Sequence, residues 1–312
     1  MPSLDPDIAA LLSSLPPPSP PSDPKALRIE IGEIVTFLGQ NRKPSSSEVS
    51  TTDIPVPLIP GCRLRRYDRT PPTAGPALLF FHGGGWVVGD IQTHDAFCRR
   101  LCSETGLTII SADYRLAPEH PFPAAALDAI AIAEALIRTP ESFGLQTDRL
   151  IVAGDSAGAT LAAAVCNKFG REAVHSLAGQ LLIYPATDLD GDFPSRESFA
   201  TGYFLSMDEV RWYYDQYTPD ARSRLDPLAS PLRAAEWPGI PPTLVVTAGF
   251  DPLRDEGRAY ADALRTAGTI VHELREEELV HGFVLMDAIS SGADRAVSRL
   301  TAKIVDIFVS QI

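Results

Sequence analysis

The segment Gly154-Asp-Ser-Ala-Gly158 restricts what this chain can fold into more than any other feature of the sequence. It follows an apolar run, Leu150–Ala153, and precedes an alanine-rich stretch, Ala157–Phe169, so we predict a strand, a tight turn and a helix in that order. Glycine on both sides of the serine fits a turn that has no room for Cβ atoms. This context is typical of a nucleophile elbow, whose strain exposes the serine hydroxyl. A glycine-rich helix start without chemistry is the alternative.

Apolar strands alternate with amphipathic helices on both sides of this turn. That alternation predicts the α/β class, with a mostly parallel central sheet covered by helices on both faces. The expected strands are Ala77–Phe81, Leu107–Ala112, Leu150–Ala153, Gly179–Tyr184, Pro242–Ala248 and Ile270–Leu274. The expected helices are Lys25–Gly39, Thr93–Glu104, Pro123–Ile137, Ala157–Phe169, Met207–Tyr217, Arg254–Ala267 and Ala293–Val309. A chain of 312 residues buries enough surface to fold without disulfides or metals.

Two regions interrupt the alternation. In residues 187–236, Pro, Gly, Asp and Ser surround one expected helix, so we predict a lid or cap inserted into the core. Near the N-terminus, the proline-rich Leu15–Pro24 is expected to link a helical turn to the next helix, rather than to bind a proline-reading module. A polar, Ser-rich link is expected over Pro44–Thr52. The predicted organisation is an N-terminal part of the cap (1–50), a catalytic core (51–186 and 237–312) and a cap insertion (187–236).

Charge and cysteine usage exclude several kinds of partner. Forty acidic and 27 basic residues give a net charge of −13 and a pI near 4.9, so the surface would repel the phosphates of nucleic acid. No stretch reaches the ~20 apolar residues of a membrane helix, and acidic residues precede the short run Ile8–Leu12 where an export signal carries positive charge. The cysteines at 62, 98, 102 and 166 form neither a CxxC pair nor a Cys/His cluster. We therefore predict free thiols, no metal site and a cytoplasmic protein.

A second glycine run, His82-Gly-Gly-Gly-Trp86, follows the first apolar strand directly. Glycine lets the backbone approach a reacting centre and direct N–H groups at a carbonyl oxygen that becomes negative during acyl transfer. We predict that the N–H groups of Gly83, Gly84 and Ala157 form this oxyanion hole and that His82 braces the loop. Neither a G-x-x-x-x-G-K-[ST] loop nor a G-x-G-x-x-G loop after the first strand is present, so no cofactor is expected.

A serine nucleophile needs a base and a carboxylate that orients the base. In a fold with this elbow, the carboxylate and then the histidine follow the serine at the ends of later strands. Asp251 and His281 each follow an expected strand, so we predict a triad of Ser156, His281 and Asp251. The alternatives are His175 and His272 for the base and Asp255 and Glu256 for the carboxylate. We interpret the two histidines as surface or structural residues, and the two carboxylates fall one turn into a helix.

Together these motifs resemble the hormone-sensitive-lipase-like carboxylesterases of the α/β-hydrolase superfamily. The resemblance runs from about Ala77 to the C-terminus. It rests on His82-Gly-Gly-Gly-Trp86, Asp113-Tyr-Arg-Leu-Ala-Pro-Glu119, Gly154-Asp-Ser-Ala-Gly158, Asp251-Pro-Leu-Arg-Asp255 and His281-Gly-Phe283. One departure is Ala159, where the family commonly has a second glycine after the elbow. The resemblance implies an α/β-hydrolase fold with a helical cap, and hydrolysis of short- to medium-chain acyl esters through an acyl-enzyme.

The resemblance also implies roles around the site. Asp155 would be the acidic group beside the nucleophile, and Arg115 and Glu119 would pair to brace a loop. Aromatic residues of the cap insertion and of the two loops predict an apolar substrate pocket, although such aromatics can equally form the core of a cap. The pocket candidates are Trp86, Asp155, Tyr203, Phe204, Trp212 and Phe283.

The expected partners are a small ester and, because family members often pair through an edge strand, a second copy of the chain. The same triad could serve a lactone, an amide or an acetylated natural product, and some relatives without the base are small-molecule receptors.

Overall fold

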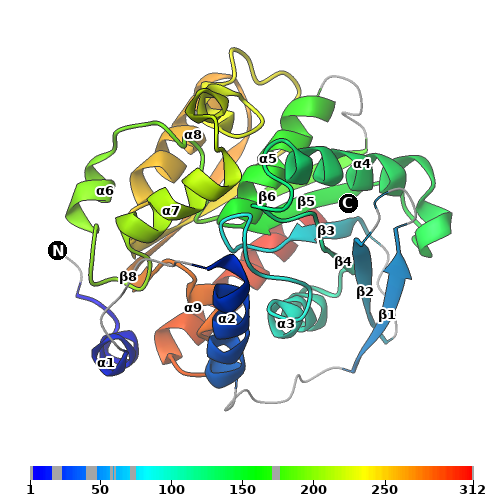
Figure 1. Cartoon of the computed structure of the whole chain (residues 1–312). Helices are drawn as coiled ribbons and strands as arrows, with labels where there is room; N and C mark the ends of the chain where they lie inside the picture. The colour runs from blue at the N-terminus through cyan, green and yellow to red at the C-terminus, as the bar shows by residue number, and fades with distance from the viewer. Residues whose placement is uncertain are drawn as a thin grey trace.

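The part of the chain that the structure describes forms one eight-stranded sheet and nine α-helices (Figure 1). This structure is a computed structural model, and it describes residues 3–15, 23–39, 48–56, 59, 61–70, 75–170 and 176–310. The strands are β1 (Val49–Pro55), β2 (Arg63–Arg69), β3 (Ala77–Phe81), β4 (Ile109–Ala112), β5 (Leu150–Asp155), β6 (Leu177–Ile183), β7 (Thr243–Phe250) and β8 (Val271–Val280). The α-helices are α1 (Pro6–Ser14), α2 (Pro24–Gly39), α3 (Asp95–Thr105), α4 (Ala124–Arg138), α5 (Ala157–Phe169), α6 (Pro194–Ser198), α7 (Met207–Tyr217), α8 (Arg254–Thr266) and α9 (Ser291–Ile304). Short helical turns cover Pro140–Phe143, Ala221–Leu225, Pro231–Arg233, Phe283–Leu285 and Val305–Val309.

The strands lie in the order β1-β2-β4-β3-β5-β6-β7-β8. From β4 to β8 all neighbours pair in parallel, and β2 is antiparallel to both β1 and β4. The parallel strands β3 to β7 are buried on two faces, because Leu79 and Phe81 of β3 pack in a core with α4, α5 and α8 while Leu78 and Phe80 pack in a second core with α3 and α9. Burial on both faces explains the continuous apolar runs of the sequence and confirms the predicted α/β class.

Strands β1 and β2 correct the sequence prediction. The polar link expected over Pro44–Thr52 was wrong from Val49 onward, where β1 begins. Charged side chains cover this edge of the sheet, as where Arg65 of β2 lies opposite Asp53 of β1 and binds it at 2.6 Å. In β2 only Leu64 and Tyr67 are buried, so the apolar signal of a strand is weak.

Strand β8 is also longer than predicted. It was expected to end at Leu274, but it continues through the charged run Arg275–Glu278 to Val280. As an edge strand it tolerates charges, and Glu276 forms an ion pair with Arg299 of α9. The extension brings the chain directly to His281 at the end of the strand.

The N-terminal helices are fastened to the rest of the molecule by buried or bidentate polar contacts. The buried Asp5 caps α1 and accepts a hydrogen bond from Ser290 Oγ at 2.9 Å. On α2, Arg28 binds both carboxylate oxygens of Glu119, at 2.9 and 2.7 Å. The expected pairing of Glu119 with Arg115 is therefore wrong, because Arg115 pairs with Asp128 of α4. None of the described helices is both long and apolar enough to cross a membrane.

Candidate active site

Ser156 lies in a strained turn between β5 and α5. Its backbone has φ 52° and ψ −120°, and its N–H donates to Ile183 O of the neighbouring strand at 2.9 Å. A Cβ atom at Gly158 would lie 2.0 Å from Phe81 O, so only glycine allows the helix to start this close to β3. A non-glycine residue at positive φ costs about 1–3 kcal/mol, which the packed strand and helix sustain. Ala159, the departure from the family pattern, is fully buried in the core behind this turn.

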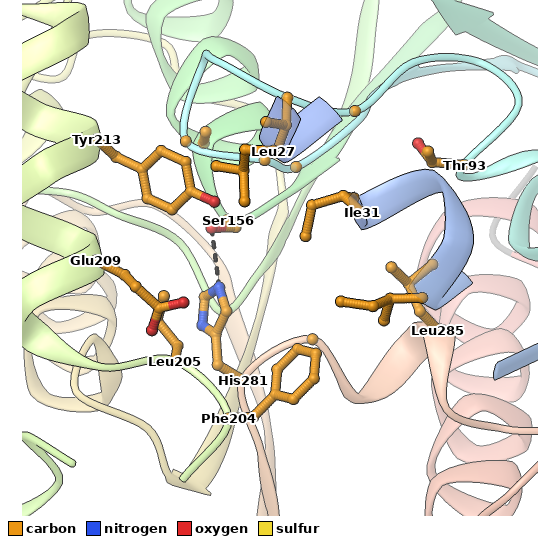
Figure 2. Close-up of a pocket in the computed structure, with 18 of the residues that line it drawn as sticks. Leu27, Ile31, Thr93, Ser156, Phe204, Leu205, Glu209, Tyr213, His281 and Leu285 are labelled. Carbon is orange, nitrogen blue, oxygen red and sulfur yellow. Dashed lines mark hydrogen bonds between the residues drawn. The ribbon is translucent and has the colours of Figure 1, made fainter. Parts of the chain in front are cut away.

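The three predicted triad residues meet at the ends of β5, β7 and β8. His281 Nε2 lies 2.9 Å from Ser156 Oγ (Figure 2). On the other side of the ring, His281 Nδ1 lies 2.8 Å from Asp251 Oδ2. Asp251 is fully buried, and its other oxygen accepts the N–H of Leu253 at 2.8 Å. Because an ionised carboxylate only accepts, the imidazole proton belongs on Nδ1, which leaves Nε2 free to accept from the serine hydroxyl.

The rival carboxylates, which both lie on α8, bind other groups. Asp255 binds the adjacent Arg254 at 2.7 Å. Glu256 is buried against Arg196, at 2.5 Å, and also accepts the N–H of Thr187. Burial raises the pKa of Glu256 to about 7 in spite of the opposing effect of Arg196. Glu256 therefore fixes the start of residues 187–236, and Asp255 also accepts the N–H of Ser195 at 2.9 Å, so the carboxylate that contacts His281 is Asp251.

Two of the other histidines, His82 and His272, lie in structural positions. His272 is in β8, opposite Leu244 of β7, and His175 falls outside the described residues. His82 is buried, and its Nδ1 lies 2.8 Å from Gly83 O, so this nitrogen donates to the carbonyl. Burial, and next the charge of His94, lower the pKa of His82 and keep its ring neutral. This placement agrees with the predicted role of His82 in bracing the loop.

The glycine loop departs from the prediction by one residue. The N–H of Gly83 donates to Asp155 Oδ1 at 2.7 Å, so it is not available to a substrate. Among the described residues, none accepts the N–H groups of Gly84, Gly85 or Ala157, and all three residues border the cavity. Gly85, which the sequence reasoning missed, has φ 58°, and a Cβ there would lie 2.3 Å from the ring of Tyr213. The available amides are therefore those of Gly84, Gly85 and Ala157.

Asp155 joins the elbow to this loop through a buried network that the sequence showed only in part. Besides the Gly83 N–H, it contacts His94 Nε2 at 3.2 Å and accepts the hydroxyl of Tyr184 at 3.3 Å. Burial alone would raise the pKa of Asp155, but the charge of His94 and these hydrogen bonds outweigh it and lower the pKa. The ring of Tyr184 in turn lies 4.5 Å from that of His281. His94 was missed because nothing in its local sequence marks it.

A cavity of about 430 Å³ opens in front of Ser156, which is within the usual range for small-molecule sites. One wall is an apolar row on α2, and Figure 2 shows Leu27 and Ile31 of this row facing the serine. The opposite wall comes from residues 187–236, with Leu205 and Tyr213. The two regions that interrupt the sequence pattern thus cover the same site, above the carboxyl ends of the central strands.

Three of the six pocket candidates border this cavity: Trp86, Asp155 and Phe204. The indole of Trp86 is nevertheless only 1% exposed and stacks on Tyr217, with ring centroids 4.2 Å apart. The indole therefore packs in the core that supports the glycine loop.

The other three candidates do not line the cavity, which corrects the prediction. Tyr203 stacks on Phe250 at 5.2 Å, and Trp212 packs edge-on against Tyr213 at 5.3 Å. Phe283 is fully buried beneath the histidine loop. These aromatics form the core of their own segments, which was the alternative reading of the sequence.

No group of three or more His, Cys, Asp or Glu side chains among the described residues is arranged to hold a metal ion. The four cysteines are free and buried. Burial raises the pKa of each thiol, for example that of Cys62 to about 12.

Known proteins share this architecture. Residues 78–285 match the family described by the alpha/beta hydrolase fold. The carboxylic ester hydrolase LipN of Mycobacterium tuberculosis is 40% identical over 260 residues, which are 81% of this chain and 69% of LipN. The chain belongs to the hormone-sensitive-lipase-like family of α/β-hydrolases. An ethyl acetate hydrolase of Pseudomonas putida is 36% identical over 80% of this chain and 79% of its own.

Solved structures of this hydrolase family agree with that placement. An esterase from Pyrobaculum calidifontis matches with a TM-score of 0.89 and 35% identity, over 98% of this chain and all of that one. The predicted family and α/β-hydrolase fold are confirmed. The predicted enzyme class is confirmed at the level of the family, since these relatives carry the names esterase and ester hydrolase.

Proposed function

We propose that this α/β-hydrolase cleaves carboxylic esters of short- to medium-chain acyl groups through an acyl-enzyme at Ser156. The observation that carries the proposal is the chain of contacts from Ser156 Oγ to His281 and on to the buried Asp251, at 2.9 and 2.8 Å, at the base of an apolar cavity. The names of the similar proteins, an ethyl acetate hydrolase among them, support the class of substrate.

In the first half-reaction, Ser156 Oγ forms a bond to the ester carbonyl carbon while His281 Nε2 takes the hydroxyl proton. The C–O bond to the alcohol then breaks, and the imidazolium returns the proton to the leaving oxygen. In the second half-reaction, water attacks the acyl-enzyme and His281 repeats both transfers. Asp251 accepts a hydrogen bond from the Nδ1 proton and stabilises the imidazolium. Because Asp251 is completely buried, its electrostatic attraction to the imidazolium is stronger than it would be in water.

The carbonyl oxygen becomes an oxyanion in each tetrahedral intermediate. We assign its stabilisation to the N–H groups of Gly84, Gly85 and Ala157, because the described residues supply no other acceptor for them. Ala157 also begins α5, whose N-terminus carries partial positive charge. Loss of one such donor typically costs a factor of about 10²–10³ in kcat.

We assign the two wall-forming segments to a cap: the N-terminal residues up to about 50, and residues 187–236. Their apolar side chains suit the alkyl part of an ester, and the cavity volume of about 430 Å³ suits short to medium chains. Besides Asp155, the carboxylates of Asp23, Glu30 and Glu209 also border the cavity. They favour neutral or cationic esters over anionic ones.

The homodimer and the cytoplasmic location remain predictions, which light scattering and cell fractionation test.

The test compares Ser156→Ala with Ser142→Ala, a serine exposed on the surface outside the cavity. Ser156→Ala is expected to lower kcat on p-nitrophenyl butyrate by more than about 10³-fold and to abolish labelling by a fluorophosphonate, while Ser142→Ala changes neither. Circular dichroism checks that both variants fold. Full activity in folded Ser156→Ala would refute Ser156 as the nucleophile. A native protein that the probe does not label would favour a receptor.

A further inference from the structure

Phe204 has a backbone conformation that is costly for a bulky residue. Its φ is 65°, and the N–H of Leu205 donates to Tyr203 O at 2.8 Å, which closes a three-residue turn around it. Turns of this kind with positive φ at the centre are rare and strained. Figure 2 shows the Phe204 ring at the edge of the cavity, beside the chain that follows His281. Strain of this kind is typically retained where it positions a functional side chain.

A second hollow, of about 240 Å³, also borders Phe204. Apart from Glu33, its lining is entirely apolar, and it is built from Leu11, Leu15, Ile34, Phe37, Leu38 and Phe204. Four of these residues also border the substrate cavity: Leu15, Ile34, Leu38 and Phe204. They are the wall between the two spaces. Phe204 alone among them comes from residues 187–236, and the other three belong to the N-terminal segment.

We propose that Phe204 determines the chain-length specificity of the enzyme. Its ring ends the substrate cavity, so that an unbranched alkyl chain stops there, and the second hollow is the space that a longer chain would enter without the ring. The inference rests on the proposed function and names the substrate class that the site selects. The strained turn fits this role, because it fixes a ring in the path of the chain where a relaxed backbone would direct the side chain elsewhere.

The gain from opening the wall follows from the apolar surface that leaves water. Each methylene buried in the second hollow is worth about fourfold in affinity. A chain that places four methylenes there would therefore gain at most about 200-fold. Imperfect packing and the ordering of the chain reduce this gain. We expect Phe204→Ala to raise the ratio of kcat/KM for a twelve-carbon ester to that for a four-carbon ester by at least tenfold.

The experiment is a double-mutant cycle with Leu11→Trp, because Leu11 lines the second hollow but not the substrate cavity. The substrates are p-nitrophenyl esters of four, eight and twelve carbons, and a matched series of alkyl acetates. Leu11→Trp alone should leave the ratio unchanged, since native chains do not reach the hollow. In the double variant, the added indole should fill the hollow and return the ratio to its native value. If the ratio rises in only one of the two series, that series shows whether the acyl chain or the alcohol chain enters the second hollow.

An unchanged ratio in Phe204→Ala overturns the proposal, and so does a gain that persists in the double variant. If Phe204→Ala does not fold, Phe204→Leu shortens the side chain less and should raise the same kcat/KM ratio by a smaller factor. If the native enzyme hydrolyses no ester of either series, the proposed function has failed. Calorimetry with octan-1-ol then still tests the wall, because Phe204→Ala should bind it at least tenfold more tightly and Leu11→Trp should cancel the gain.

Discussion

Arg28 joins helix α2 to the loop that carries the oxyanion glycines, and we predict that its removal weakens substrate binding more than turnover. Its Nε donates to Val87 O at 2.8 Å and its Nη2 to Ala117 O at 2.9 Å, besides the two bonds to Glu119. The N–H of Val87 in turn donates to Gly84 O at 3.0 Å. Arg28 therefore holds both α2 and the turn that follows the glycines.

The magnitude follows from the exposure of each contact. The side chains of Arg28 and Glu119 are 28% and 43% exposed, so their ion pair is worth at most about 1 kcal/mol. The two bonds from the charged guanidinium to backbone carbonyls are each worth about 1.5 kcal/mol. Arg28→Ala thus removes about 3–4 kcal/mol of docking between α2 and the core, whereas Glu119→Gln removes less than about 1 kcal/mol.

Because α2 supplies a wall of the cavity and no reacting group, the loss should appear in KM. We expect Arg28→Ala to raise KM for p-nitrophenyl butyrate about tenfold and to change kcat less than threefold, and Glu119→Gln to raise KM less than threefold. Arg28→Lys should fall between them, since an ammonium cannot reach a carboxylate and two carbonyls at once. An unchanged KM in Arg28→Ala, or equal effects of Arg28→Ala and Glu119→Gln, would refute the reasoning.

The same pair makes a prediction about pH. Arg28 lowers the pKa of Glu119 to about 2. A carboxylate with a lowered pKa contributes stability above its ordinary pKa, and that contribution is lost as the pH falls through the lowered value. The difference in melting temperature between the native enzyme and Glu119→Gln should therefore be constant from pH 5 to pH 8. A difference that vanishes by pH 5 would show that the pair does not form.

Further predictions concern the groups that surround the reacting atoms. Gly85→Ala places a Cβ against a tyrosine ring of α7 at positive φ, so kcat should fall at least about 100-fold, whereas Gly32→Ala, with open space around its Cβ, should not change kcat; equal rates for both would contradict the assigned amides. Asp155→Asn removes the charge that binds His94, so we expect kcat to fall about 10- to 100-fold at nearly constant KM; a loss confined to KM would count against a positioning role.

The sequence predicts the residues of the candidate triad well, because parallel strands bring their carboxyl ends to one edge of the sheet. Asp251 and His281 lie 30 residues apart and far from Ser156 in sequence, yet each directly follows a strand of that sheet. Strands buried on both faces are also easy to find, since their apolar runs are continuous. The edge strands β1 and β2 lack such runs. The polar and charged residues of these strands make the sequence resemble a linker.

Ion pairs between distant segments are beyond local sequence reasoning. Arg115 and Glu119 are close enough in sequence to pair, and the fold separates them all the same. Asp128 of α4 lies next to Arg115, while α2 brings Arg28 to Glu119 from 91 residues away. Which acid a given arginine binds depends on where the helices pack, and the position of α2 is set by its apolar row over the cavity.

The assignment of the oxyanion amides shows the same limit within a single loop. Gly83, Gly84 and Gly85 are alike in sequence, so nothing local distinguishes the two that face a substrate. The deciding group is Asp155, which precedes the nucleophile and accepts the Gly83 N–H. That bond fixes the first glycine to the elbow and so sets the distance between Ser156 and the next two amides. One carboxylate thus positions Ser156 and the proposed oxyanion donors relative to each other. Its charge should therefore matter for kcat, although it touches neither the transferred proton nor the substrate carbonyl of the proposed reaction.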